Sequence, residues 1–93
     1  MSTLTNVFAK HANATGTIYS GATNVGGYQI KPGGTAGTIE LRDGGSGGTL
    51  LLELDITTNT AVIATLLPGN GIRFTSSVYV VLPTGAAITI FCG

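Results

Sequence analysis

Hydrophobic and polar residues alternate most clearly in two stretches near the middle of the chain, Thr38–Arg42 and Leu50–Ile56. A period of two places successive side chains on opposite faces of a β-strand, so each stretch predicts a strand with one buried face. Between the two stretches lies Asp43–Gly48, whose four glycines predict a chain reversal. The three segments together predict an antiparallel β-hairpin.

The register of this hairpin depends on which side chains share its buried face. Five aliphatic residues belong to that face: Ile39, Leu41, Leu50, Leu52 and Leu54. One register that satisfies this condition sets Glu40 directly against Glu53, and like charges opposed on a sheet cost up to about 1 kcal/mol. We therefore predict the other register, in which Leu41 lies opposite Leu50 and Ile39 opposite Leu52. It closes with the four-residue loop Gly44–Gly47.

Six further segments combine β-branched or aromatic residues with flanking glycine or proline, a pattern typical of strands and turns. They are Gly16–Ser20, Gly27–Lys31, Ala61–Leu67, Gly71–Phe74, Val78–Leu82 and Ala87–Cys92. A short helix is the alternative for Ala61–Leu67, but its β-branched centre and the stop at Pro68–Gly69 favour a buried strand.

About eight short strands without a sustained helical period predict an all-β fold, either a small antiparallel β-sandwich or a jelly roll. A chain of 93 residues has room for one domain. We assign residues 15–93 to a single β-sandwich domain and residues 1–14 to an N-terminal arm.

The last two predicted strands are apolar on both faces. Val78, Val80 and Leu82 alternate with Tyr79 and Val81, and the strand that ends at Cys92 repeats the pattern with Phe91. A single small sandwich has one interior, so the second apolar face needs cover from the arm or from another subunit. We predict an oligomer interface that contains Tyr79, Val81 and Phe91.

The composition also indicates that other molecules cover much of the protein's surface. Only 9% of the residues are charged and the formal net charge is zero, which is far from the charged surface expected of a soluble monomer. The four cations are scattered along the chain, which argues against nucleic-acid binding by charge: Lys10, Lys31, Arg42 and Arg73. The longest apolar run, Val78–Pro83, is too short for a membrane-spanning helix, so we expect no membrane partner.

Residues that carry out chemistry are few. His11 is the sole histidine, and we predict that it is exposed in a loop. The chain has no Gly-x-Ser-x-Gly motif that would supply a nucleophilic serine for it. Glu53 and Asp55 share one strand face, a spacing that acid/base pairs and metal sites use but that a plain solvated face also shows. Cys92 has no second cysteine with which to form a disulfide, and we predict that it packs as a small buried apolar residue. We therefore predict no enzyme, no catalytic residue, no metal and no cofactor.

Two C-terminal segments, Leu67–Val80 (LPGNGIRFTSSVYV) and Ile88–Gly93 (ITIFCG), resemble the ends of small structural proteins of tailed bacteriophages. The resemblance implies a virion protein that is assembled in the bacterial host cytoplasm and decorates or cements the outside of the capsid. It also implies two partners, which are the major capsid protein and the chain itself, as a homotrimer or another closed oligomer. The arm, residues 2–14, is then a candidate to reach a neighbouring subunit.

Two other function classes stay open from the sequence. A tail or fibre component would bind host-surface glycan through exposed tyrosine and asparagine side chains. An enzyme would require Glu53, Asp55 and His11 to converge in one concave pocket.

Overall fold

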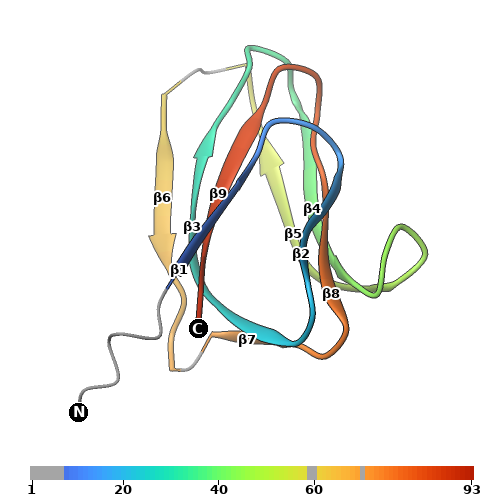
Figure 1. Cartoon of the computed structure of the whole chain (residues 1–93). Coiled ribbons are helices and arrows are strands. Elements are labelled where there is room, and N and C mark those ends of the chain that lie inside the picture. The colour runs from blue at the N-terminus through green and yellow to red at the C-terminus, as the bar shows by residue number, and fades with distance from the viewer. Residues whose placement is uncertain (1–7, 59–60, 70) are drawn as a thin grey trace.

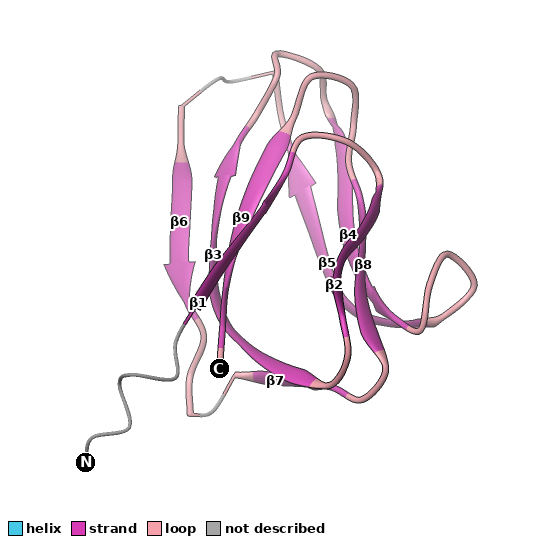
Figure 2. Cartoon of the chain, viewed as in Figure 1, coloured by secondary structure: helices cyan, strands magenta, loops and turns pink. Residues whose placement is uncertain are grey.

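The protein is built from β-strands. The computed structural model describes residues 8–58, 61–69 and 71–93, and within these ranges the chain forms nine strands joined by turns and loops, without a helix (Figure 2). They are β1 (Phe8–Ala12), β2 (Gly16–Ser20), β3 (Thr23–Lys31), β4 (Gly37–Asp43), β5 (Thr49–Ile56), β6 (Ile63–Leu66), β7 (Ile72–Phe74), β8 (Ser77–Val81) and β9 (Ala87–Cys92). The predicted all-β fold is confirmed. In the described part of the chain we find no helix long and apolar enough to cross a membrane.

The strands form two antiparallel sheets with the topology of a jelly roll (Figure 1). Sheet A has the order β1-β9-β3-β6, with β7 also paired to β3, and sheet B has the order β2-β8-β4-β5. The pairs β4·β5, β3·β6, β2·β8 and β1·β9 are those of one long hairpin. Rolling up this hairpin adds the pairs β3·β9 and β4·β8, which closes the ribbon into two stacked sheets.

The core lies between the sheets and follows the alternation within each strand. On β8 and β9 every second residue is fully buried, because a strand in a two-layer sandwich turns one face inward. The largest side chains that are buried to this degree come from both sheets: Phe74, Ile30, Ile39, Leu41, Ile88, Ile90, Val25, Val78 and Val80.

Part of the predicted N-terminal arm is a strand of the sandwich. β1 pairs with β9 from Phe8 opposite Cys92 to Ala12 opposite Ile88, so it extends sheet A at its edge and does not cover a face. Phe8 and Tyr19 of β2 bring their rings to 5.2 Å between centroids, which closes the sandwich on this side. The sequence prediction missed β1 because Ala9–Ala12 is polar and lacks a β-branched run. Residues 1–7 of the arm lie outside the described part.

The predicted hairpin is confirmed, but its predicted register is wrong. Leu41 lies opposite Leu52 and Ile39 opposite Leu54, which sets Glu40 directly against Glu53. The like charges are tolerated because Arg42 Nε donates to Glu40 Oε1 at 2.8 Å. The loop is one residue longer than expected and runs from Gly44 to Gly48.

A β-bulge in the same hairpin explains why the face assignment also failed. Arg42 pairs with Leu50 and Leu41 with Leu52, so Leu51 is the extra residue on β5. Leu51 packs against the core, whereas Leu50 is exposed. The strict period of two in the sequence cannot reveal this shift.

The predicted strand at Ala61–Leu67 is confirmed as β6, but it is exposed along its length and not buried. Ile63 lies opposite Ile30 of β3 and therefore faces inward, yet it remains 42% exposed. The reason is its place at the edge of sheet A, where sheet B leaves the inner side chains of β6 uncovered. Leu52 and Leu54 of β5, the edge strand of sheet B, are likewise only half-buried.

Candidate interaction surfaces

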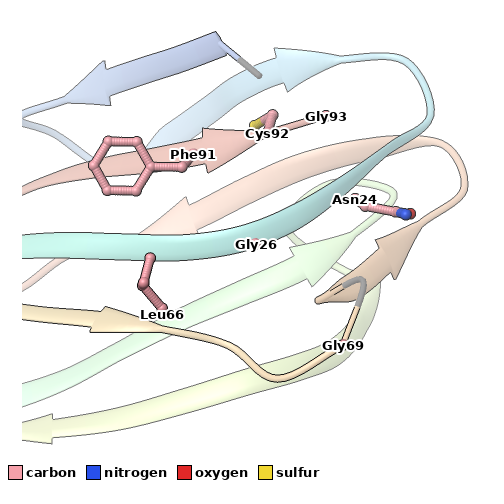
Figure 3. Close-up of a pocket in the computed structure, with 7 residues that line it drawn as sticks. All are labelled: Asn24, Gly26, Leu66, Gly69, Phe91, Cys92 and Gly93. Carbon is pink, nitrogen blue, oxygen red and sulfur yellow. The ribbon is translucent and has the colours of Figure 1, made fainter. Parts of the chain in front are cut away.

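The outer face of sheet A carries Phe91 and Leu66 beside a glycine. Phe91 of β9 and Leu66 of β6 both lie opposite Gly27 of β3, on its two sides. Figure 3 shows the side chains of Phe91 and Leu66. A Cβ at Gly27 would lie 3.1 Å from Leu66 Cδ2 and 3.4 Å from Phe91 Cδ2, so these two side chains occupy the space that glycine leaves. Phe91 is half-buried, but Leu66 is 82% exposed.

A shallow hollow of about 320 Å³ lies next to this pair at the end of the sheet (Figure 3). Its lining is mostly apolar or backbone: Asn24, Gly26, Leu66, Gly69, Phe91, Cys92 and Gly93. Among the described residues, the lining contains no acidic, basic or histidine side chain, so the hollow offers mainly an apolar contact surface.

A second hollow, of about 180 Å³, lies toward the other end of the same sheet. His11 and Lys31 line it together with Thr89, and His11 Nδ1 lies 2.9 Å from Thr89 Oγ1. His11 is exposed as predicted, but it belongs to strand β1 and not to a loop.

The outer face of sheet B carries the other apolar residues that the sequence singled out. Tyr79 and Val81 of β8 are half-buried and alternate with the fully buried Val78 and Val80. Tyr79 lies opposite Arg42 of β4, and Val81 lies opposite Glu40. The ion pair between Arg42 and Glu40 therefore lies beside Tyr79 and Val81 on the outer face of sheet B.

The predicted interface residues do not form one patch. Tyr79 and Val81 lie outside sheet B, whereas Phe91 lies outside sheet A, so the sandwich separates them. The sequence could show that each strand is apolar on both faces. It could not show that β8 and β9, although adjacent in the chain, belong to different sheets.

Exposed apolar side chains also occur on and next to β5 and β6, the edge strands of the two sheets, and sequence reasoning did not identify them. Four of the large apolar side chains that are exposed lie on or next to these strands: Leu50, Val62, Ile63 and Leu66. The leucine-rich stretch of β5 was the available signal, but its alternation was read as a single buried face.

The candidate catalytic groups are not brought together. Glu53 and Asp55 lie exposed on β5 of sheet B, and Thr38 Oγ1 donates to Asp55 Oδ1 at 3.1 Å. His11 lies on β1 of sheet A, and neither carboxylate lines the hollow that contains it. Across the described residues no group of three histidine, cysteine or acidic side chains is placed to hold a metal ion.

Asp43 has a structural role that the sequence did not reveal. Its Oδ2 accepts from the Thr75 N–H at 2.9 Å and from the Thr75 hydroxyl at 2.8 Å. Its Oδ1 accepts from the N–H groups of Ser76 at 2.9 Å and Ser77 at 3.3 Å. These bonds, led by the Thr75 N–H, lower the pKa of Asp43 from 3.8 to about 2. Asp43 thus holds the turn between β7 and β8 against the end of β4.

Cys92 is buried in β9, as predicted, with 1% of its surface exposed. Burial raises the pKa of its thiol, because the charged thiolate is poorly solvated there. The group therefore packs as an apolar residue.

Comparison of the sequence with protein-family models and with curated proteins, and of the structure with solved structures, finds no match. The function is therefore inferred from the surfaces of the chain itself.

Proposed function

We propose that this chain is a non-enzymatic structural protein that works in many copies, through contacts of its own surfaces with other copies and with a larger partner. The observation that carries the proposal is the placement of apolar side chains outside the core. Both outer sheet faces and the β5/β6 edge present such side chains, with Leu66 at 82% exposure as the extreme case. Interaction sites in soluble proteins bury apolar side chains that are exposed outside the core.

The low charge of the chain supports the same proposal. Repulsion between copies is weak, because 93 residues carry only four cations and four carboxylates. Specific interfaces bury roughly 1,200 to 2,000 Å² in total. A small sandwich that offers two broad faces and one open edge can make several contacts of this size in an assembly, and repeated contacts add through avidity.

The larger partner that we propose is the outside of a tailed-phage capsid, where the chain acts as a decoration or cement protein bound to the major capsid protein. The support is the resemblance of the C-terminal segments to phage structural proteins. Jelly rolls occur in viral capsid proteins, and also in lectins, so the fold is compatible with this function without selecting it.

Self-association is tested by adding a charge to the apolar surface. Phe91→Asp and Leu66→Asp place a carboxylate on the outer face of sheet A, and we expect each to shift the protein toward monomer by at least about tenfold in dissociation constant. Light scattering coupled to size-exclusion chromatography measures the shift. Leu66 is exposed, so the second variant folds even where the first does not.

Ser46→Asp in the exposed β4–β5 loop is the matched control, since it adds the same charge on sheet B's side of the sandwich and not on the outer face of sheet A. The control should retain the oligomer of the unmodified protein. An oligomer that persists unchanged in Leu66→Asp and in a folded Phe91→Asp would show that this face does not take part.

The capsid partner is tested on phage particles. Negative-stain images of shells with and without the protein should show additional density at capsid lattice points when it is present. Density confined to the tail, or reproducible sugar binding by the isolated protein on a glycan array, would instead favour a host-recognition component.

A further inference from the structure

The charged side chains are divided between the two sheets, although the chain as a whole is neutral. All eight of them lie in described strands. Sheet A holds three cations and no carboxylate: Lys10, Lys31 and Arg73. Sheet B holds all four carboxylates and one cation: Glu40, Asp43, Glu53, Asp55 and Arg42. The side chains of sheet A therefore carry three positive charges, and those of sheet B carry a net three negative charges.

Two of the cations of sheet A lie on its outer face. Lys31 is exposed and follows the buried Ile30 on β3, so it points away from the core. Arg73 is exposed beside the buried Phe74 on β7, and its Nη1 donates to Asn24 Oδ1 at 3.3 Å. Lys10 is different, because its Nζ lies 5.7 Å from the centroid of the Tyr19 ring in the opposite sheet.

Two carboxylates of sheet B remain outside any ion pair with a described side chain. Glu40 is paired with Arg42 at 2.8 Å, and Asp43 is engaged by the turn before β8. Glu53 and Asp55 are exposed on β5. They lie opposite Glu40 and Thr38, which are on the outer face of β4 because Ile39 and Leu41 point inward.

We propose that copies of this chain stack head to tail, with the outer face of sheet A of one copy against the outer face of sheet B of the next. This rests on the self-association proposed above and specifies its geometry. Two sheet A faces would oppose cation to cation, and two sheet B faces would oppose carboxylate to carboxylate, so charge disfavours both symmetric pairings. The unlike pairing sets Lys31 and Arg73 against a face that carries Glu53 and Asp55.

The same arrangement gives the half-buried aromatic residues a partner. Phe91 lies on the face that would be covered by a neighbour's Tyr79 and Val81, which the sandwich otherwise keeps apart. A standard interface buries roughly 800 Å² per partner, which is the area that each outer face would have to supply in such a stack.

A head-to-tail contact is heterologous, because two different surfaces of the chain meet. Such contacts build a ring when the rotation between neighbours closes and a filament when it does not. The proposal therefore predicts that both faces of every inner copy are covered, and that variants of either face interrupt growth.

Charge reversal tests the stacking on the full chain. Lys31→Glu and Glu53→Lys should each weaken self-association by about tenfold or more at low salt, since an attraction becomes a repulsion. An equimolar mixture of the two should recover it, because each variant keeps one unaltered face and the two altered faces again have opposite charge. Sedimentation velocity measures all three samples, and raising NaCl from about 50 to about 500 mM should weaken association of the unmodified protein.

Lys10→Glu is the matched control, since it changes the net charge by the same amount but lies beside Tyr19 and not on the outer face. It should associate like the unmodified protein. The stacking is overturned if the single reversals leave association unchanged, if the mixture does not recover it, or if Lys10→Glu weakens it equally. In these cases an oligomer of the unmodified protein would still support the proposed function, whereas a monomer at every concentration would overturn both.

Discussion

At the scale of single residues, polar groups and glycines at turns define the fold together with the core. Asp43 ties the β7–β8 turn to the end of β4 through four hydrogen bonds. Gly71 has a φ of 79° and lies so close to Val25 of β3 that an added Cβ would clash with its carbonyl oxygen. Each of these residues fixes where a strand begins, and each gives a testable expectation.

Asp43 predicts a stability difference that depends on pH. Its pKa is lowered in the folded chain to about 2 from 3.8, so the unfolded chain takes up the proton first as the pH falls. The contribution of the ionised Asp43 carboxylate to folding stability is complete above about pH 4 and is lost between about pH 4 and pH 2. Asp43→Asn should therefore melt at a lower temperature than the unmodified protein at pH 6, and the gap should narrow toward pH 2. Circular dichroism melts of both proteins measure this gap, and a gap independent of pH would contradict the role of the carboxylate.

Gly71 and Gly69 provide a matched pair for backbone effects. Both have positive φ, but a Cβ at Gly69 would meet nothing within 4 Å, whereas one at Gly71 would lie 2.1 Å from the Val25 carbonyl oxygen. We expect Gly69→Ala to cost about 1 kcal/mol from conformation alone, and Gly71→Ala to cost about 2 kcal/mol more because the backbone must move. Urea denaturation measures both, and equal costs would show that close approach to β3 is unimportant.

At the scale of elements, the sequence predicts well where strands occur but predicts poorly how neighbouring strands pair and in which register. The period of two predicted the strands now seen as β4 and β5, and β-branched or aromatic residues between glycine and proline predicted β2, β3, β6, β7, β8 and β9. The hairpin register was missed because the argument counted the repulsion between Glu40 and Glu53 without the cation beside them. Arg42 is two residues from Glu40 on the same strand face, and its Nη1 also donates to the Gly48 carbonyl oxygen at 3.0 Å. A bulge at Leu51 then shifted the remaining pairs.

This explanation of the register predicts coupling between Arg42 and Glu53. Arg42→Ala leaves Glu40 directly opposite Glu53 without its cation, and we expect a loss of about 1 kcal/mol in unfolding free energy. Glu53→Gln should recover part of this loss in the Arg42→Ala background and have a smaller effect when Arg42 is present. A double-mutant cycle from denaturant unfolding gives the coupling. Additive effects would mean that Arg42 does not offset the opposed carboxylates.

At the scale of the whole molecule, the proposed contacts between copies depend on how apolar and charged side chains are distributed between the two sheets. The sequence shows a neutral chain with apolar residues on both faces of its last strands, but sheet membership comes from the jelly-roll topology, which depends on long-range pairing. Only that topology places Phe91 and Tyr79 on the outer faces of different sheets and separates cations from carboxylates. The exposed side chains of β5 and β6 were missed as well, because the alternation in β5 predicted one buried face and does not show that β5 lies at the edge of its sheet.

The claim that the protein works in many copies is tested most directly by sedimentation velocity of the unmodified full chain across a range of concentrations. The account predicts one or more discrete species of several times the mass of a single 93-residue chain, which become more abundant as the concentration rises. A single monomeric species throughout, up to about millimolar concentration, would contradict it, because apolar faces that are covered by other copies in an assembly should associate at that concentration.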